Sequence, residues 1–170
     1  LFSRIQTGDF FLDVGANIGE ICLHAAKKVG KEGKVWAFEP IPINLENLKK
    51  NISLNPDLEG IIQLFPFAVG EKDQHKIAFI HPRKDNQGMI RVQPKGDSTD
   101  AFAISQVRSL DSLVAKKGVD QLTGIKIDVE GYELEVLKGG RKSLRQYHPW
   151  LFIELDDNNL TSQGDSAQEL

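Results

Sequence analysis

Residues 10–20 constrain the fold more than any other part of the chain. An apolar run at residues 10–12 is typical of a strand buried on both faces, and it breaks into Gly-Ala-Asn-Ile-Gly at residues 15–19 before an amphipathic run begins. This pattern predicts a strand, a tight glycine turn and a helix whose free N–H groups and positive dipole end face a ligand. We therefore expect a nucleotide-type binding site at this turn.

Two acidic residues near the turn indicate which ligand it would hold. The spacing of Gly15 and Gly19 differs from the Gly-x-Gly-x-x-Gly of dinucleotide enzymes, and Asp13, before the first glycine, suits a ligand with an ammonium group better than one with a pyrophosphate. Glu39 follows Gly19 by 20 residues, at the end of the next predicted strand, where its carboxylate can accept both hydroxyls of a ribose. The alternative for Glu39 is a solvated acid that caps a nearby turn.

Apolar periodicity in the rest of the chain predicts an α/β fold. Further strands are expected at residues 34–38, at 61–69 with a bend at Pro66, at 124–129 and at 150–155. Helices are expected from the glycine turn to Val29, from Pro42 to residue 55, at 109–117 and at 130–138. The first helix would bury Ile18, Ile21, Ala25 and Val29. Short connections between these elements predict parallel strands with right-handed crossovers.

The segment at residues 70–107 follows a different pattern. Its apolar residues come in short runs at 75–80, 89–92 and 101–107, separated by proline and polar residues. We interpret it as an antiparallel excursion from the parallel sheet, with a mobile loop. The polar tail from residue 156 onward is expected to begin a helix in its last residues.

Composition excludes several classes of protein. The 170 residues fit one domain, and the 21 Lys and Arg residues are scattered and outnumbered by 24 Asp and Glu residues, so we expect no nucleic-acid partner. The lone Cys22 cannot form an internal disulfide and fits a reducing compartment. No apolar run approaches the length of a membrane span. We therefore expect a cytoplasmic protein.

Acidic residues recur where the predicted strands end, at the edge where an open parallel sheet binds its ligand. They are Asp13, Glu39, Asp128, Glu130 and Glu154. Asp128 and Glu130 flank a strand-to-helix junction, and both can face the cleft only if the chain turns between them, which Gly131 makes easier.

A structural role for these acids is the alternative. Glu130 would then favour the helix N-terminus, Glu133 and Glu135 would form the solvated face of that helix, and Asp128 would pair with Lys126. No histidine is near in sequence, and the spacing of the acids fits no standard metal-binding loop, so no metal is predicted.

Six short motifs follow the order and spacing seen in FkbM-type methyltransferases. They are Asp-Val-Gly-Ala-Asn-Ile-Gly at 13–19, Phe-Glu-Pro at 38–40, Ala-Val-Gly at 68–70, Ser-Leu-Asp at 109–111, Lys-Ile-Asp-Val-Glu-Gly-Tyr-Glu at 126–133 and Phe-Ile-Glu at 152–154. The resemblance implies the mostly parallel, three-layer, Rossmann-like sheet of class I methyltransferases. The last two strands of that family are absent from this sequence, so residues 1–170 are expected to be a single, C-terminally truncated methyltransferase domain.

The resemblance also implies a ligand and an activity. The ligand is S-adenosylmethionine, and the usual acceptors are hydroxyls of sugars, glycans, polyketides or related secondary metabolites. The methionine part would be held by Asp13, Gly15, Ala16, Asn17 and Gly19, and the ribose by Glu39. Ala68 would lie near the adenine through its backbone, and Pro40 and Asp128 would also contact the cofactor.

Methyl transfer to an alcohol needs a base that takes the hydroxyl proton. Asp128, Glu130 and Glu154 are the candidate catalytic residues for this role. Two other functions stay open. One is a nicotinamide-dependent oxidoreductase of related fold, which the missing Gly-x-Gly-x-x-Gly argues against. The other is a non-catalytic relative that binds the cofactor without turnover.

Overall fold

A five-stranded parallel sheet forms the centre of the computed structural model, which describes residues 1–80, 90–93, 100–166 and 168. Its order is β3-β2-β1-β8-β9, and every neighbouring pair is parallel. The strands are β1 (Phe10–Val14), β2 (Lys34–Phe38), β3 (Ile62–Phe65), β8 (Gly124–Ile127) and β9 (Trp150–Ile153). The predicted α/β class with parallel strands is confirmed.

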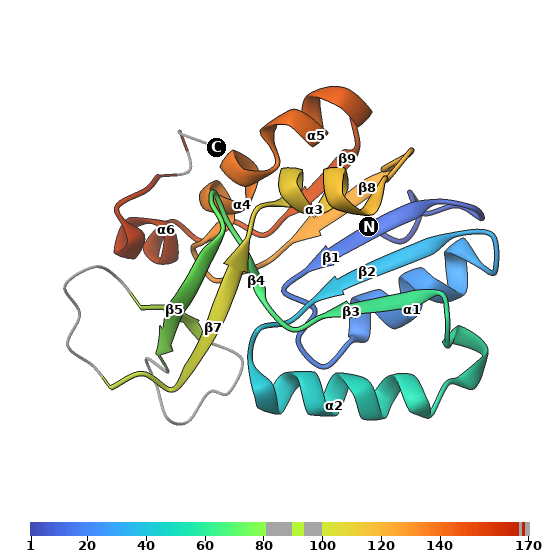
Figure 1. The fold of residues 1–170 in the computed structure, drawn as a ribbon, viewed down its shortest axis with the longest axis horizontal. Helices are drawn as coiled ribbons and strands as arrows, with labels where there is room; N and C mark the ends of the chain where they lie inside the picture. The colour runs from blue at the N-terminus through green and yellow to red at the C-terminus, as the bar shows by residue number, and fades with distance from the viewer. Residues whose placement is uncertain (81–89, 94–99, 167, 169–170) are drawn as a thin grey trace.

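Helices cover both faces of this sheet, which gives the predicted three layers (Figure 1). On one face, α1 (Glu20–Val29) and α2 (Pro42–Ser53) pack against Phe11, Val35 and Ala37, and the short 3-10 helix η1 (Pro56–Leu58) follows α2. On the other face, α3 (Leu110–Lys117), α4 (Glu133–Gly139) and α5 (Arg141–Tyr147) pack against Leu12 and Trp36. Successive side chains of β1 thus point to opposite layers, as strand geometry requires.

A second sheet lies beyond the carboxyl ends of the parallel strands (Figure 1). It has the order β4-β7-β5-β6 and consists of β4 (Ala68–Val69), β5 (Gln74–Ile80), β6 (Arg91–Val92) and β7 (Ala103–Arg108). β5 pairs antiparallel with β6 and β7, which confirms the predicted excursion, whereas β4 runs parallel to β7. Much of the predicted loop, at residues 81–89 and 94–99, lies outside the described residues.

Three sequence predictions about element boundaries are wrong. The strand expected at 61–69 divides at Pro66, which cannot donate to a ladder, into β3 and β4 in different sheets. Ile18 is 46% exposed because α1 begins only at Glu20. The helix expected at 130–138 begins at Glu133 because Glu130 and Gly131 adopt φ values of +53° and +98°.

Helices α5 and α6 (Asp157–Gln163) were not predicted where they occur. The carboxylate of Asp111, in α3, accepts hydrogen bonds from the backbone N–H groups of Lys142 and Ser143 at the start of α5. Helix α6 lies earlier in the tail than the expected helix, because Asp156 caps it by accepting from the backbone of Asn158.

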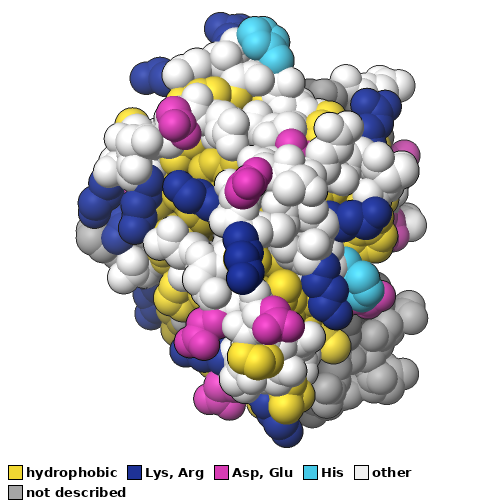
Figure 2. All heavy atoms as spheres, turned by 90° about the vertical axis from the view of Figure 1, so that its right-hand side faces the viewer, with side chains coloured by type: hydrophobic (Ala, Val, Ile, Leu, Met, Phe, Trp, Pro, Cys, Tyr) yellow, Lys and Arg dark blue, Asp and Glu magenta, His cyan; other side chains and the backbone are white. Residues whose placement is uncertain are grey.

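Charges of both signs share the side of the molecule that lies on the right in Figure 1. Among the described residues of that face, Lys and Arg side chains are interspersed with Asp and Glu (Figure 2). Within the described ranges, no helix combines the length and apolar character that crossing a membrane would require.

Candidate active site

The candidate site is a cavity between the carboxyl ends of the parallel strands and the second sheet. The predicted site residues that line it are Gly15, Asn17, Glu39, Pro40, Ala68, Asp128, Glu130 and Glu154. Asp13, Ala16 and Gly19 are buried and do not line it. Of the five strand-end acids, Glu39, Asp128, Glu130 and Glu154 meet at this cavity, as expected for parallel strands, and Asp13 does not reach it.

Both glycines of the turn pack closely against other parts of the chain. Gly15 has a φ of +83°, and a Cβ there would overlap the backbone oxygen of Asp128. Gly19 has a φ of +99°, and a Cβ there would overlap the side chain of Leu48. The glycines are therefore required by backbone conformation and by close packing of the turn on β8 and α2. The predicted tight turn is confirmed by the positive φ of both glycines, and Gly15 also lines the cavity.

Replacing Gly15 by Ala should destabilise the fold itself. The positive φ costs about 1–2 kcal/mol for a residue with a Cβ, and the overlap with Asp128 adds about 1–3 kcal/mol. Gly8→Ala is the matched control, since Gly8 has a φ of +85° and nothing within 4 Å of its Cβ position. Urea unfolding of both variants measures the difference. Equal losses of stability in Gly15→Ala and Gly8→Ala would show that the overlap with Asp128 adds nothing to the cost of the positive φ.

Glu39 is held by the backbone at the mouth of the glycine turn. One carboxylate oxygen accepts from Asn17 N and the other from Ile41 N, both at 2.8 Å, and the residue is 4% exposed. Burial raises the pKa of Glu39, and these hydrogen bonds oppose the rise. Glu39 is thus not a solvated acid, although it does hold a turn. Oε2 keeps a lone pair with which to accept from a ligand hydroxyl in the cavity, whereas Oε1 also accepts from Asn44 Nδ2, in a long contact of 3.5 Å.

Asp13 is fully buried beneath the cavity and pairs with a cation of the chain itself. The Nζ of Lys126 lies 3.2 Å from Asp13 Oδ1 and 3.3 Å from Asp128 Oδ2, and it donates to Gly15 O at 2.8 Å. Burial alone would lower the pKa of Lys126, but the two carboxylates outweigh it and raise the pKa. Burial raises the pKa of Asp13, against the effect of Lys126. The predicted Lys126–Asp128 pair is confirmed, and the ammonium that meets Asp13 is that of Lys126.

Glu130 combines partial burial with three acidic neighbours. Burial, and then the carboxylates of Asp128, Glu154 and Glu133, raise its pKa to about 7. The amide of Asn159 donates to Glu130 Oε2 at 2.7 Å. The carboxylate of Asp128 also raises the pKa of Glu154, which is exposed. A carboxyl group with a pKa near 7 is suited to act as a general base at neutral pH.

Glu133 holds the turn that carries Glu130, which the sequence did not predict. Its Oε1 accepts from the backbone N–H groups of Val129 and Gly131, at 3.1 and 3.2 Å, and the residue is 2% exposed. The expectation that Glu133 and Glu135 form a solvated helix face is wrong, because Glu133 is buried and Glu135 is half-buried and pairs with Lys138.

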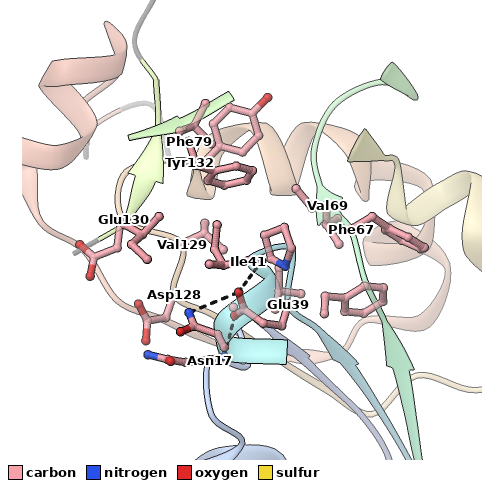
Figure 3. A pocket seen from close by; sticks show the side chains of 18 of the residues that line it. Asn17, Glu39, Ile41, Phe67, Val69, Phe79, Asp128, Val129, Glu130 and Tyr132 are labelled. Carbon is pink, nitrogen blue, oxygen red and sulfur yellow. Dashed lines mark hydrogen bonds between the residues drawn. The ribbon is translucent and has the colours of Figure 1, made fainter. Parts of the chain in front are cut away.

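An apolar wall faces the acidic residues across the cavity. Figure 3 shows Asp128 and Glu130 on one side, Phe67 and Val69 on the other, and Glu39 between them. Phe79 and Tyr132 close a third side, and burial raises the pKa of Tyr132 to about 12, so its hydroxyl keeps its proton. Sequence reasoning missed this wall because it depends on how the second sheet docks.

Groups of the chain itself partner three acids of the cavity. Asp128 pairs with Lys126, Glu130 accepts from Asn159, and Glu39 accepts from two backbone N–H groups. Among the described residues, no group of three or more His, Cys, Asp and Glu side chains is arranged to hold a metal ion.

The chain is similar to known methyltransferases. The family model of the methyltransferase FkbM domain matches residues 13–170. Methyltransferase sdnD of Sordaria araneosa is 26% identical, over 81% of this chain and 62% of the relative. The hexuronic acid methyltransferase AglP of Haloferax volcanii is 31% identical, over 91% of this chain and 59% of the relative. The chain thus spans less than two thirds of either relative.

Two solved structures, one of them of a methyltransferase, share the fold. Methyltransferase FkbM from Methylobacillus flagellatus KT has a TM-score of 0.61 and 26% sequence identity, covering 85% of this chain and 32% of that chain. Fibrillarin of Aeropyrum pernix has a TM-score of 0.50 at 12% identity, covering 95% of this chain and 57% of that chain. The predicted Rossmann-like methyltransferase sheet is confirmed.

Proposed function

The chain belongs to the FkbM methyltransferase family, and we propose that the protein of which it forms part transfers a methyl group from S-adenosylmethionine to a hydroxyl of a sugar, glycan or secondary metabolite. The observation that carries this proposal is the cavity at the strand ends, which both Glu39 and Glu130 line. The similarity to AglP, whose name states that it methylates a hexuronic acid, supports a carbohydrate acceptor.

The residues of the cavity fit the cofactor part by part. The free lone pair on Glu39 Oε2 suits one ribose hydroxyl, and a second hydroxyl can replace the long contact of Oε1 with Asn44. Gly15 and Asn17 line the side where the methionine part would lie. Phe67 and Ala68 offer an apolar surface for the purine. When bound, S-adenosylmethionine would supply an electrophilic methyl carbon and a sulfur atom that can leave with the electron pair of the methyl–sulfur bond.

Glu130 is the carboxylate best suited to take the acceptor's proton. It lines the cavity, and its pKa near 7 makes it more basic than an ordinary carboxylate while still largely ionised at slightly alkaline pH. Asp128 is paired with Lys126, and Glu154 is the most exposed of the three. The hydroxyl proton therefore passes to Glu130, and the other two acids hold the electrostatic environment that raises its basicity.

Calorimetric titration with S-adenosylhomocysteine and a product screen on the full-length protein test the proposal. Binding followed by methylation of a hydroxyl acceptor is the expected result. Binding without turnover on any acceptor would favour the non-catalytic relative, and no binding would contradict the proposed cofactor.

Replacing Glu39 by Ala should raise the Kd for S-adenosylhomocysteine by about 100-fold or more. The variant loses hydrogen bonds to both ribose hydroxyls, each about 1.5–3 kcal/mol at most. Glu46→Ala is the control, since Glu46 is exposed on α2. Calorimetry measures the Kd, and circular dichroism checks that the glycine turn survives the loss of its acceptor. An unchanged Kd would leave Glu39 with a structural role only.

A further inference from the structure

Helix α6 packs its first turn directly against the turn that carries Glu130. A Cβ at Gly131 would lie 2.5 Å from the backbone oxygen of Asn159, so the two backbones are in contact. Asp156 caps the helix, and Leu160 is fully buried. The position of Asn159 relative to Glu130 is therefore set by packing of the main chain.

The side chain of Asn159 is directed at the proposed base. Its Nδ2 donates to Glu130 Oε2 at 2.7 Å, and the residue is 9% exposed. An ionised carboxylate only accepts hydrogen bonds, so this contact stabilises the ionised form of Glu130. Glu133 fixes the backbone of the turn, but the torsions of the long Glu130 side chain need a separate partner. Asn159 supplies it at Oε2, and among the described residues no donor bonds Oε1.

The far end of α6 is tied to the second sheet. Gln163 Nε2 donates to Val92 O at 2.7 Å, and Arg91 Nη1 donates to Ser162 Oγ at 3.2 Å. Ser162 Oγ in turn donates to Asn159 O at 2.7 Å. Since Val92 lines the cavity, α6 connects the wall of the second sheet to the acidic side.

We propose that Asn159 is a positioning residue for methyl transfer, which holds one oxygen of the Glu130 carboxyl group and so directs the other toward the acceptor hydroxyl. The inference rests on the proposed function and deepens it. Asn159 is not among the residues that line the cavity, so it acts through Glu130.

The groups that face Glu130 oppose one another in their effect on its proton affinity. Asp128 at the end of β8, Glu154 at the end of β9 and Glu133 on α4 all raise its pKa, whereas the hydrogen bond from Asn159 lowers it. Loss of the Asn159 amide therefore leaves the three carboxylates unopposed. The Glu130 carboxyl group then holds its proton to higher pH, and its side chain loses its fixed direction.

An NMR titration of the chain tests the hydrogen bond without any need for turnover. The side-chain carboxyl carbons of glutamate are labelled with ¹³C, and the Glu130 signal is assigned by its absence in Glu130→Gln. In Asn159→Ala, we expect the midpoint of this signal to rise by about 0.5–1 pH unit, and in the isosteric Asn159→Asp, which adds a fourth carboxylate, to rise further. Asn158→Ala, at an exposed neighbour on the same helix, should leave it unchanged.

Kinetics of the full-length protein test the positioning role. In Asn159→Ala, the acid limb of the pH profile of kcat should move to higher pH. The plateau of that profile should stay about tenfold below the plateau of Asn158→Ala, and the KM for S-adenosylmethionine should be unchanged. An unmoved Glu130 midpoint in both Asn159 variants, or an unchanged plateau, would overturn the positioning role. If the Glu130 midpoint moves in the Asn159 variants but the parent protein methylates no acceptor, the hydrogen bond stands and the proposed function is overturned instead.

Discussion

Replacing Glu130 by Gln should lower kcat by about 100-fold or more and abolish the acid limb of the rate profile. The amide keeps the shape of the side chain but cannot take a proton from the acceptor. In the parent protein the limb should have its midpoint near the pKa of Glu130, about 7. Measurement of kcat from pH 5.5 to 9 on the full-length protein checks both expectations, and the Kd for S-adenosylhomocysteine should stay close to the parental value.

Glu154→Gln and Asp128→Asn serve as controls for the same experiment. Each removes a carboxylate that raises the pKa of Glu130, so each should move the acid limb to lower pH without abolishing it. Loss of the limb in Asp128→Asn, with the limb preserved in Glu130→Gln, would make Asp128 the base instead.

The same Glu130→Gln variant should be more stable than the parent at pH 8. The ordinary glutamate pKa of 4.5 is raised in the folded protein to about 7, so the unfolded chain releases this proton first as the pH rises. The parent therefore loses stability between about pH 4.5 and 7, by about 1–2 kcal/mol once solvent screening of this half-buried group is allowed for. Thermal unfolding should show the gain in Tm at pH 8 and little gain at pH 4.5. Equal gains at both values would contradict the linkage.

Replacing Lys126 by Met should lower the free energy of unfolding by about 3–5 kcal/mol. The ammonium is nearly fully buried and lies within 3.3 Å of two carboxylates, and its loss leaves Asp13 charged and buried without a cation. The loss of the ammonium destabilises the charge of Asp128 less, because 34% of its side chain is exposed to water. Urea unfolding at neutral pH measures the loss.

A double variant separates the buried charge from the loss of packing. Lys126→Met combined with Asp13→Asn removes both charges, so it should recover most of the lost stability. Lys138→Met is the control for a surface pair, since Lys138 bonds Glu135 at 2.7 Å on the partly exposed side of α4 and should contribute about 1 kcal/mol or less. A double variant as unstable as Lys126→Met alone would show that the unpaired Asp13 is not the cause.

Local sequence patterns correctly predicted the elements whose bounds depend only on residues nearby in the sequence. The apolar run of β2 ends at Glu39 and Pro40, and the prediction of residues 34–38 is confirmed in full. The start of α4 could not be predicted in the same way. It depends on the turn at Glu130, which Glu133 holds through two backbone hydrogen bonds and against which Asn159 packs.

The site was predictable to the extent that parallel strands bring their carboxyl ends together. Glu39, Asp128, Glu130 and Glu154 meet at one cavity for that reason. The role of Gly15 was not predictable, because the atom that excludes a side chain there belongs to Asp128, more than a hundred residues away. The wall that includes Phe79 depends on pairing of the second sheet, which short apolar runs do not specify.

The place of β1 at the centre of the sheet has a consequence for how the protein must be made. Phe10 pairs beside Lys34, an early neighbour in the sequence, but Phe11 pairs beside Gly124, which leaves the ribosome much later. Until β8 arrives, the central strand has an open edge of buried-type apolar residues, the kind of surface that promotes aggregation. The contact between Gly15 and Asp128 forms only at that late stage, so the ligand cavity cannot exist in a nascent N-terminal fragment.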